Sequence, residues 1–321
     1  MGEFELIERF FKRPARHADL GVGDDCALLS PRPGHQLALS VDALVEGRHF
    51  LSTVAPERLG HKCLAVNLSD LAACGAQPRA FLLSLSLPRA DAVWLQAFAQ
   101  GLFALADAHG CELVGGDTTQ GPLNIGITVI GDVPTGQALL RSGARAGDDI
   151  YVSGQLGDAR LALEAFRGQL SLPEAVLNAC RARMEQPTPR VALGQALRGV
   201  ASAAADISDG LLGDLGHILH QSAVGAQLLL PACEALLGCR EQVPLDTHWL
   251  RTAVLAGGDD YELVFTAAPA QRQAVAQAAQ ASQTPVHRIG QITAEPGTRL
   301  FDGQGQAVDV PVAGFDHFAP H

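Results

Sequence analysis

The segment FLLSLSL at residues 81–87 shows the two-residue alternation of a β-strand that buries one face. A few residues later, residues 92–110 carry apolar side chains at helical spacing and end in Gly110, which predicts a helix. The spacing of apolar residues therefore changes from that of a strand to that of a helix within a few positions. Chains with this pattern form sheets that are covered by helices. The sequence therefore predicts a mixed α/β (α+β) protein.

Other segments extend this pattern. In the first half we expect a helix at residues 4–12 and a helical stretch at 57–76 that breaks before Asp70. Strands are expected at 36–44, 111–119 and 124–133. In the second half we expect helices at 157–166, 190–201 and 269–281, and strands at 149–154, 226–230, 261–268, 287–292 and 298–302. Residues 232–250 give no clear prediction.

Residues 134–148 form a glycine-rich connection without a strong period, which marks the best domain boundary. With 321 residues, two domains are the natural expectation, and we expect them at 1–137 and 138–321. The hydrophobic fraction of 47% is that of a globular protein, and no run has the roughly 18–20 apolar residues of a membrane span. The acidic start has no signal-type apolar core, so a cytoplasmic location is expected.

Charge and rare residues exclude several classes of protein. A net charge of -11 argues against nucleic acid as a partner, because phosphate backbones bind to basic faces. The two lysines, Lys12 and Lys62, lie in neither a P-loop nor a protein-kinase signature. The seven cysteines include no CxxC pair and no histidine at zinc spacing, so buried reduced thiols are expected.

Aspartate recurs where apolar segments run into glycine or serine. The contexts are GVGDD, LALSVD, AVNLSD, CELVGGD, ADISD and AVLAGGDD, which contain Asp25, Asp42, Asp70, Asp117, Asp206, Asp209 and Asp259. Each aspartate alone could be a turn former or a helix cap. Taken as a set, they suggest loops that converge on a ligand, because loops on rigid scaffolds carry function and small neighbours let backbone approach.

Converging carboxylates need cations. Two carboxylates about 4 Å apart repel by about 4 kcal/mol at an effective dielectric of 20. Oxygen ligands without cysteine or histidine favour Mg²⁺ or Ca²⁺, and protein-bound Mg²⁺ is usually completed by water and substrate phosphates. The residues therefore predict a site with several Mg²⁺ ions for a polyphosphate.

Taken together, the motifs resemble the thiamine-monophosphate kinase family within the PurM-like (aminoimidazole ribonucleotide synthetase) superfamily. In family order, and across almost the whole chain, they are GEFELIERFF, GVGDDCALL, SVDALVEGRHF, KCLAVNLSDLAACGAQP, GGDTT, LLRSGARAGDDIYVSG, DISDGLLGDLGHI, GGDDYELVF and GFDHF. The resemblance implies a PurM-like two-domain fold, with an N-terminal sheet that pairs across a homodimer and a C-terminal α/β domain. It also implies phosphorylation of thiamine monophosphate by ATP, giving thiamine diphosphate and ADP.

The resemblance also implies roles for individual residues. The magnesium ligands would be Asp25, Ser40, Val41, Asp42, Asp70, Asp117, Asp206 and Asp209, with Ser40 and Val41 acting through their backbone. Gly116, Asp117, Arg141 and Ser208 would contact ATP, and His49, Asp259 and Phe315 would contact the thiamine phosphate. No catalytic base is expected, because a phosphate monoester with a second pKa near 6 is already a nucleophilic dianion.

Two positions depart from the family pattern. Asp259 stands where the family usually has glutamate, and Phe315 stands where tyrosine or tryptophan is common. Two alternatives stay open from the residues. One is another ATP-using enzyme of the superfamily, and the other is a non-catalytic protein that binds Mg-nucleotide.

Overall fold

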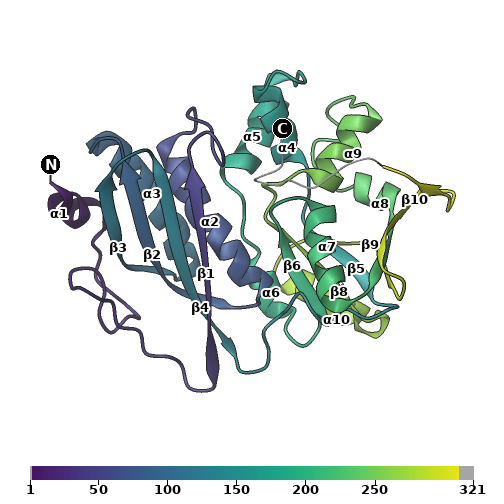
Figure 1. Cartoon of the computed structure of the whole chain (residues 1–321), viewed down its shortest axis with the longest axis horizontal. Helices are drawn as coiled ribbons and strands as arrows, with labels where there is room; N and C mark the ends of the chain where they lie inside the picture. The colour runs from purple at the N-terminus through teal and green to yellow at the C-terminus, as the bar shows by residue number, and fades with distance from the viewer. Residues whose placement is uncertain (1, 311–321) are drawn as a thin grey trace. The chain divides into compact units, whose positions relative to one another are not determined.

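A computed structural model describes residues 2–310 (Figure 1). The chain divides into two compact units. Unit 1 contains the chain up to Leu71 together with Ala76–Gly136, and unit 2 contains Ala72–Gly75 and the chain from Gln137 onward.

Unit 1 is built on a four-stranded sheet with the order β1-β4-β2-β3. Strands β1 (His35–Val45) and β2 (Gln77–Leu87) run antiparallel to β4 (Asn124–Pro134), and β3 (Glu112–Gln120) runs parallel to β2. A short helix α1 (Glu3–Leu6) and a π-helical turn η1 (Ile7–Phe11) precede the sheet. The expected strands of this half are therefore present.

Two long helices, α2 (Pro56–Ala73) and α3 (Ala92–His109), accompany this sheet (Figure 1). Local signals set the ends of α3. The Asp91 carboxylate accepts the N–H groups of Val93 and Trp94, and Gly110 ends the helix in the left-handed region at φ 59°. The core between helices and sheet includes Phe81, Ile125 and Ile127 from strands and Leu68 and Phe98 from helices, all at most 1% exposed.

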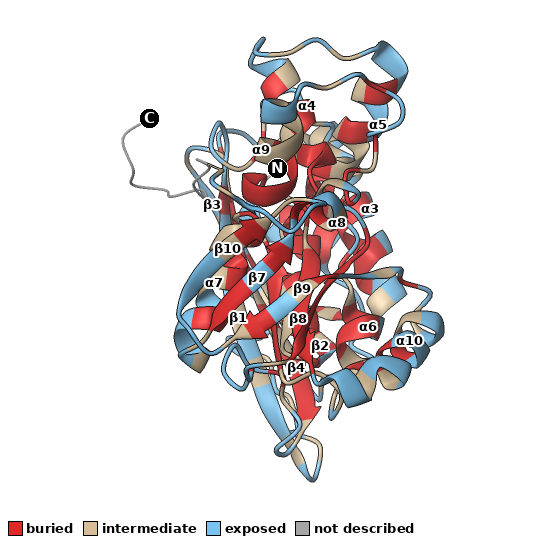
Figure 2. Ribbon diagram, turned by 90° about the vertical axis from the view of Figure 1, so that its right-hand side faces the viewer, coloured by how far each residue is buried: buried red, intermediate tan, exposed pale blue. Residues whose placement is uncertain are grey.

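Unit 2 contains a seven-stranded mixed sheet with the order β11-β10-β7-β9-β5-β8-β6. Its strands are β5 (Asp149–Ser153), β6 (Ala203–Ile207), β7 (Gly225–Leu229), β8 (Glu262–Ala267), β9 (Val286–Thr293), β10 (Gly297–Phe301) and β11 (Ala307–Val308). Strands β5, β6 and β8 are buried along their whole length, and β8 is seen in red in Figure 2. Burial on both faces explains why their sequences run apolar instead of alternating.

The helices of unit 2 are α4 (Asp158–Phe166), α5 (Glu174–Glu185), α6 (Val191–Ala196), α7 (Leu211–Ser222), α8 (Leu230–Glu234), α9 (Thr247–Ala256), the 3₁₀ turn η2 (Pro269–Gln271) and α10 (Arg272–Ala281). The expected mixed α/β class, with a sheet in each half, is confirmed. Along residues 2–310, no helix is both long and apolar enough to cross a bilayer.

Some expectations about single elements were wrong. The break expected before Asp70 does not occur, because α2 runs without interruption to Ala73, so Asp70 lies on a helix. Asp42 and Asp117 lie inside β1 and β3, and not after strand ends. The helix expected at 190–201 spans only Val191–Ala196, and α9 begins inside the stretch that gave no prediction.

Candidate active site

In unit 1, two of the proposed metal ligands lie together between β1 and α2. The hydroxyl of Ser40 on β1 donates to Asp70 Oδ2 on α2. One turn earlier on α2, Asn67 Oδ1 accepts the backbone N–H of Asp42 at 3.1 Å, and Asn67 Nδ2 donates to the Cys63 carbonyl at 2.9 Å. The buried amide of Asn67 therefore fixes β1 against α2 beside both acidic side chains.

The strand register separates Asp117 from this group. Asp42 pairs with Ile127 and Ser40 with Val129, both buried, so these side chains share the face that packs on the core. Asp117 pairs with Ser84, which in turn pairs with Gly126 on the opposite face. Because paired residues in a sheet share a face, Asp117 and Asp42 lie on opposite faces of the unit 1 sheet.

His49 follows β1 and is held by contacts on both its ring and its backbone. Its Nδ1 accepts the Val45 N–H at 3.0 Å, which leaves the proton of the neutral ring on Nε2. The buried Lys62 on α2 donates from Nζ to the His49 carbonyl at 3.1 Å. The lysine therefore helps to position the segment that carries His49.

Three other residues that the sequence assigned to metal or ATP contacts also lie in unit 1. Asp25 lies in an exposed loop, where its N–H donates to Asp24 Oδ1 at 2.8 Å. Val41 is on β1 with an outward side chain that is 66% exposed, which suits a contact through its backbone. Gly116 lies on β3 beside Asp117, with φ 146° and the Leu83 backbone too close for any side chain.

In unit 2, the structure brings several expected residues together after β6. Asp206, which is 5% exposed, lies near the end of the strand, and Ser208 and Asp209 follow in the loop before α7. The loop after α9 lies against it, because the Asp259 N–H donates to the Ser208 carbonyl at 2.9 Å. A Cβ at Gly258 would collide with that carbonyl, so the close approach depends on glycine.

Asp259 has a backbone conformation that suits aspartate. Its φ of 67° lies in the left-handed region, where Asp and Asn are enriched over longer side chains. The Tyr261 hydroxyl donates to its Oδ1 at 3.2 Å. This conformation gives a physical reason for the shorter acid at a position where glutamate was expected.

Sequence reasoning did not place Asp214 among the site residues, yet it organises this loop. Its Oδ2 accepts the N–H groups of Ser208, Asp209 and Gly210 at 3.0, 3.0 and 3.1 Å. Burial raises the pKa of Asp214 to about 7, against the N–H donors and the charge of Arg141, which act in the opposite direction. The signal that could have found it is the acid of the DGLLGD segment, which lies in the first turn of α7.

Arg141 also belongs to this neighbourhood. Its carbonyl accepts the Ser222 hydroxyl at 3.2 Å, and the preceding residue, Leu140, accepts the Ala204 N–H of β6 at 2.9 Å. The Arg141 charge acts on the Asp214 carboxylate, so arginine and loop are electrostatically coupled. The last expected contact, Phe315, lies outside the described residues.

The donor set in both units fits a hard cation. Carboxylate, hydroxyl and backbone oxygens are the ligands that Mg²⁺ prefers, and the Ser40–Asp70 pair is one such oxygen cluster. In the part of the chain that the structure describes, no three of the proposed acidic ligands have oxygens within 4.8 Å of one another. Their assignment to magnesium therefore stays a prediction.

Comparison with known proteins defines the class first. The models of AIR synthase related protein match the chain over residues 23–133 for the N-terminal domain and 145–303 for the C-terminal domain. The thiamine-monophosphate kinase of Escherichia coli (strain K12) is 44% identical over 99% of this chain and 98% of that protein. That of Bacillus subtilis (strain 168) is 34% identical over 99% and 100%.

Solved structures agree. The thiamine-monophosphate kinase from Stenotrophomonas maltophilia K279a is 45% identical, with a TM-score of 0.83 over 95% of this chain and 96% of that one. AaThiL complexed with AMPPCP and TMP is 29% identical, with a TM-score of 0.75 over 90% and 89%. E. coli HypE, at 22% identity and a TM-score of 0.75, shares the fold alone. The chain belongs to the thiamine-monophosphate kinase family, which confirms the resemblance and the PurM-like two-domain fold read from the motifs.

Proposed function

We propose that this protein transfers the terminal phosphoryl group of ATP to thiamine monophosphate, giving thiamine diphosphate and ADP. The observation that carries this proposal is identity of 44–45% with thiamine-monophosphate kinases over 99% of the chain. The relative AaThiL, complexed with AMPPCP and TMP, supports both an adenine nucleotide and a TMP site. Residues 1–137 and 138–321 are proposed as its two functional domains.

Each site residue has a proposed role. Gly116, Asp117, Arg141 and Ser208 contact ATP, and His49, Asp259 and Phe315 contact thiamine monophosphate. The coupling of Arg141 to the Ser208 loop through Asp214 supports placing both against one anionic ligand. The hydrogen bond between the Asp259 N–H and the Ser208 carbonyl supports adjacent substrate sites.

Magnesium is proposed as the metal, held by Asp25, Ser40, Val41, Asp42, Asp70, Asp117, Asp206 and Asp209. When bound, Mg²⁺ supplies positive charge that offsets the repulsion between two phosphate groups. The chain itself then needs only to position the substrates and to add the charge of Arg141. Because the acceptor phosphate is a dianion at neutral pH, no side chain has to remove a proton.

A homodimer is proposed on a feature of β1. Leu37, Leu39, Val41, Ala43 and Val45 alternate along the strand and are all exposed, with Leu39 at 63%. Five outward positions without a charge, on the edge strand of a sheet, form an apolar surface that a second copy could cover. A cytoplasmic location stays a prediction.

The test is an assay of the purified protein with ATP, Mg²⁺ and thiamine monophosphate, with products identified by mass. We expect thiamine diphosphate and ADP in equal amounts, and no product from free thiamine, which lacks the nucleophilic phosphate. Turnover of formylglycinamidine ribonucleotide instead would favour another enzyme of the superfamily. Binding of Mg-ATP without ADP release on any phosphate ester would indicate a non-catalytic protein.

The proposed chemistry is direct in-line transfer. We expect no phosphorylated protein after incubation with γ-labelled ATP, either alone or with thiamine monophosphate. A labelled protein band that chases into thiamine diphosphate would contradict direct transfer while leaving the overall reaction intact.

A further inference from the structure

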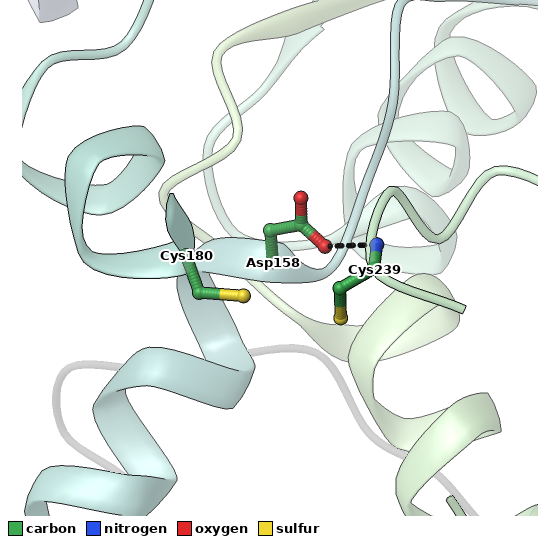
Figure 3. Close-up of side chains that lie close together, drawn as sticks. All are labelled: Asp158, Cys180 and Cys239. Carbon is green, nitrogen blue, oxygen red and sulfur yellow. Dashed lines mark hydrogen bonds between the residues drawn. The ribbon is translucent and has the colours of Figure 1, made fainter. Parts of the chain in front are cut away.

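Two cysteines that are far apart in sequence meet beside an aspartate in unit 2 (Figure 3). Asp158 begins α4, Cys180 lies on α5, and Cys239 lies in the segment after α8. One ligand atom from each, two sulfurs and a carboxylate oxygen, lie within 4.8 Å of one another. The Cys239 N–H also donates to Asp158 Oδ1 at 3.0 Å.

The three side chains of this group are buried. Cys180 is 0% exposed, Cys239 is 3% exposed and Asp158 is 8% exposed. Burial raises the pKa of Asp158, and a hydrogen bond with Cys180 together with burial raises the pKa of Cys239. A cation bound among these groups would offset this cost, because it favours the charged form of each ligand.

The segment around Gly238 brings oxygen donors to the same place. A Cβ at Gly238 would lie 2.6 Å from Gln155 Oε1 and closer still to Asp158 Oδ2. Both oxygens therefore lie close to one point next to Cys239, and only glycine leaves room for them. Gln155 is exposed, so the cluster has one side that reaches solvent.

The charges of the three ligands can be compared with that of a divalent cation. Two thiolates and a carboxylate bring three negative charges to a 2+ ion, which leaves one negative charge in excess. The positive charge of Arg183 acts on Asp158 in the direction that lowers its pKa, but burial outweighs it and raises the pKa overall. Arg183 is fixed by its ion pair with Glu262 at 3.0 Å.

We propose that Cys180, Cys239 and Asp158 bind a thiophilic divalent cation, with zinc as the metal that fits best. Two sulfurs and one carboxylate are three of the four ligands of a tetrahedral zinc site, and thiolate selects against Mg²⁺. Gln155 Oε1 or a water on the open side supplies the fourth. Each thiol releases its proton to solvent as its sulfur binds, with no change of oxidation state.

The site would be structural. It joins α4, α5 and the segment after α8 through ligands that are at least 22 positions apart along the chain, and it takes no part in the phosphoryl transfer proposed above. A metal that binds only the folded chain stabilises it by mass action, so zinc should raise the Tm.

The experiment uses the full-length, tag-free protein, reduced and stripped with a chelator, then incubated with zinc chloride alone and desalted in buffer with Mg²⁺. We expect about one zinc per chain, a higher Tm, and, with cobalt in place of zinc, thiolate-to-metal charge-transfer absorption. Cys180→Ser and Cys239→Ser should each lose about half or more of the charge-transfer intensity, because one of the two thiolates is removed, and at least tenfold in zinc affinity. Cys233→Ser, at another buried cysteine of unit 2, should keep both.

Three results would overturn the proposal. Wild-type protein could retain no zinc, it could bind cobalt without thiolate absorption, or the two serine variants could bind zinc as tightly as the wild type. The last two would assign the bound metal to other ligands, such as the acidic residues proposed for magnesium. If the serine variants do not fold, the cobalt spectrum of a Cys26→Ser/Cys74→Ser protein decides, because this protein lacks the two cysteines that are not buried and should keep the thiolate band.

Discussion

At the scale of single residues, Asp214 stabilises the conformation of the loop proposed to bind ATP. One carboxylate oxygen accepts three successive N–H groups from Ser208, Asp209 and Gly210. Hydrogen bonds to a charged group contribute about 1.5–3 kcal/mol each, against about 0.5–1.5 kcal/mol for neutral pairs. Because burial raises the pKa of Asp214 to about 7, this charge is fully present only at higher pH, and the variant is therefore compared above about pH 8. Loss of the charge there should release the loop, while the helix that follows stays folded.

We predict that Asp214→Asn raises the KM for ATP at least tenfold, equivalent to about 1.4 kcal/mol, while the KM for thiamine monophosphate changes little. Steady-state kinetics with each substrate varied in turn measures this split. Asp302→Asn is the matched control, since Asp302 also accepts two backbone N–H groups, from Gln304 and Gln306, in a turn of unit 2. A folded Asp214→Asn variant with an unchanged KM for ATP would contradict the role.

Asp259 allows a second test at this scale, on the other substrate. Its carboxylate is proposed to contact thiamine monophosphate and is held by the Tyr261 hydroxyl. We predict that Asp259→Ala raises the KM for thiamine monophosphate by about 10–100-fold, the range for loss of a charged hydrogen bond. Asp259→Asn, which keeps the size and tolerates the positive φ, separates loss of charge from backbone strain. Equal effects on the KM for ATP would argue against a substrate-specific contact.

At the scale of elements, Glu262 at the start of β8 links several segments of unit 2. It is fully buried and accepts the Ser153 hydroxyl of β5, Arg183 of α5 and both Nε and Nη2 of Arg190. Removing the charge of Glu262 is costly while its two arginine partners stay charged. The arginines would then be left partly unpaired.

We therefore predict that Glu262→Gln lowers the free energy of unfolding by about 3–5 kcal/mol, the usual cost of breaking a buried pair. Urea denaturation followed by circular dichroism measures the loss. Glu241→Gln, at an exposed glutamate of the same unit, should change stability by no more than about 0.5 kcal/mol. Equal stability of the two variants would mean that the buried network contributes nothing.

Asp149 on β5 gives a pH-dependent test. Its pKa lies below the ordinary value of 3.8, chiefly because Arg272 at the start of α10 donates to it, with Arg288 of β9 adding a second pair. The stabilisation is fully present above the unfolded pKa and is lost as the pH falls through the lowered native value. We predict that Asp149→Asn lowers the Tm by several degrees at pH 7, and that the difference from wild type shrinks below about pH 4.

Helices and strands with a strong period of apolar residues could be predicted from the sequence. Features that depend on contacts between distant residues could not. The alternation of β2 and the capped, glycine-terminated α3 were read correctly from local sequence. Asp70 was misplaced because Ser69 and Asp70 resemble a turn, yet Leu64, Leu68 and Leu71 bury one side of α2 and carry the helix through. Cys180 and Cys239 could not be joined from spacing, since only the packing of α5 against the segment after α8 brings them together.

At the scale of the whole molecule, the outward face of β1 is the surface proposed to pair with a second copy of the chain. Its outward side chains are apolar over five alternate positions, from Leu37 to Val45. Burying apolar surface of this kind is favourable by about 25 cal/mol per Å². A second copy of the chain that covers β1 would therefore lower the free energy. Association should then depend on the apolar character of this strand.

We predict that wild-type protein sediments as a dimer and that Leu39→Lys shifts it to monomer, because a lysine at this outward position would have to be buried without a partner. Sedimentation velocity at several concentrations measures the shift. Val93→Lys is the control, because Val93 is 81% exposed on α3, outside the strand, and should leave the dimer intact. If both variants sediment like the wild type, the β1 face is not the interface. A wild-type monomer at all concentrations would remove the homodimer from the proposal.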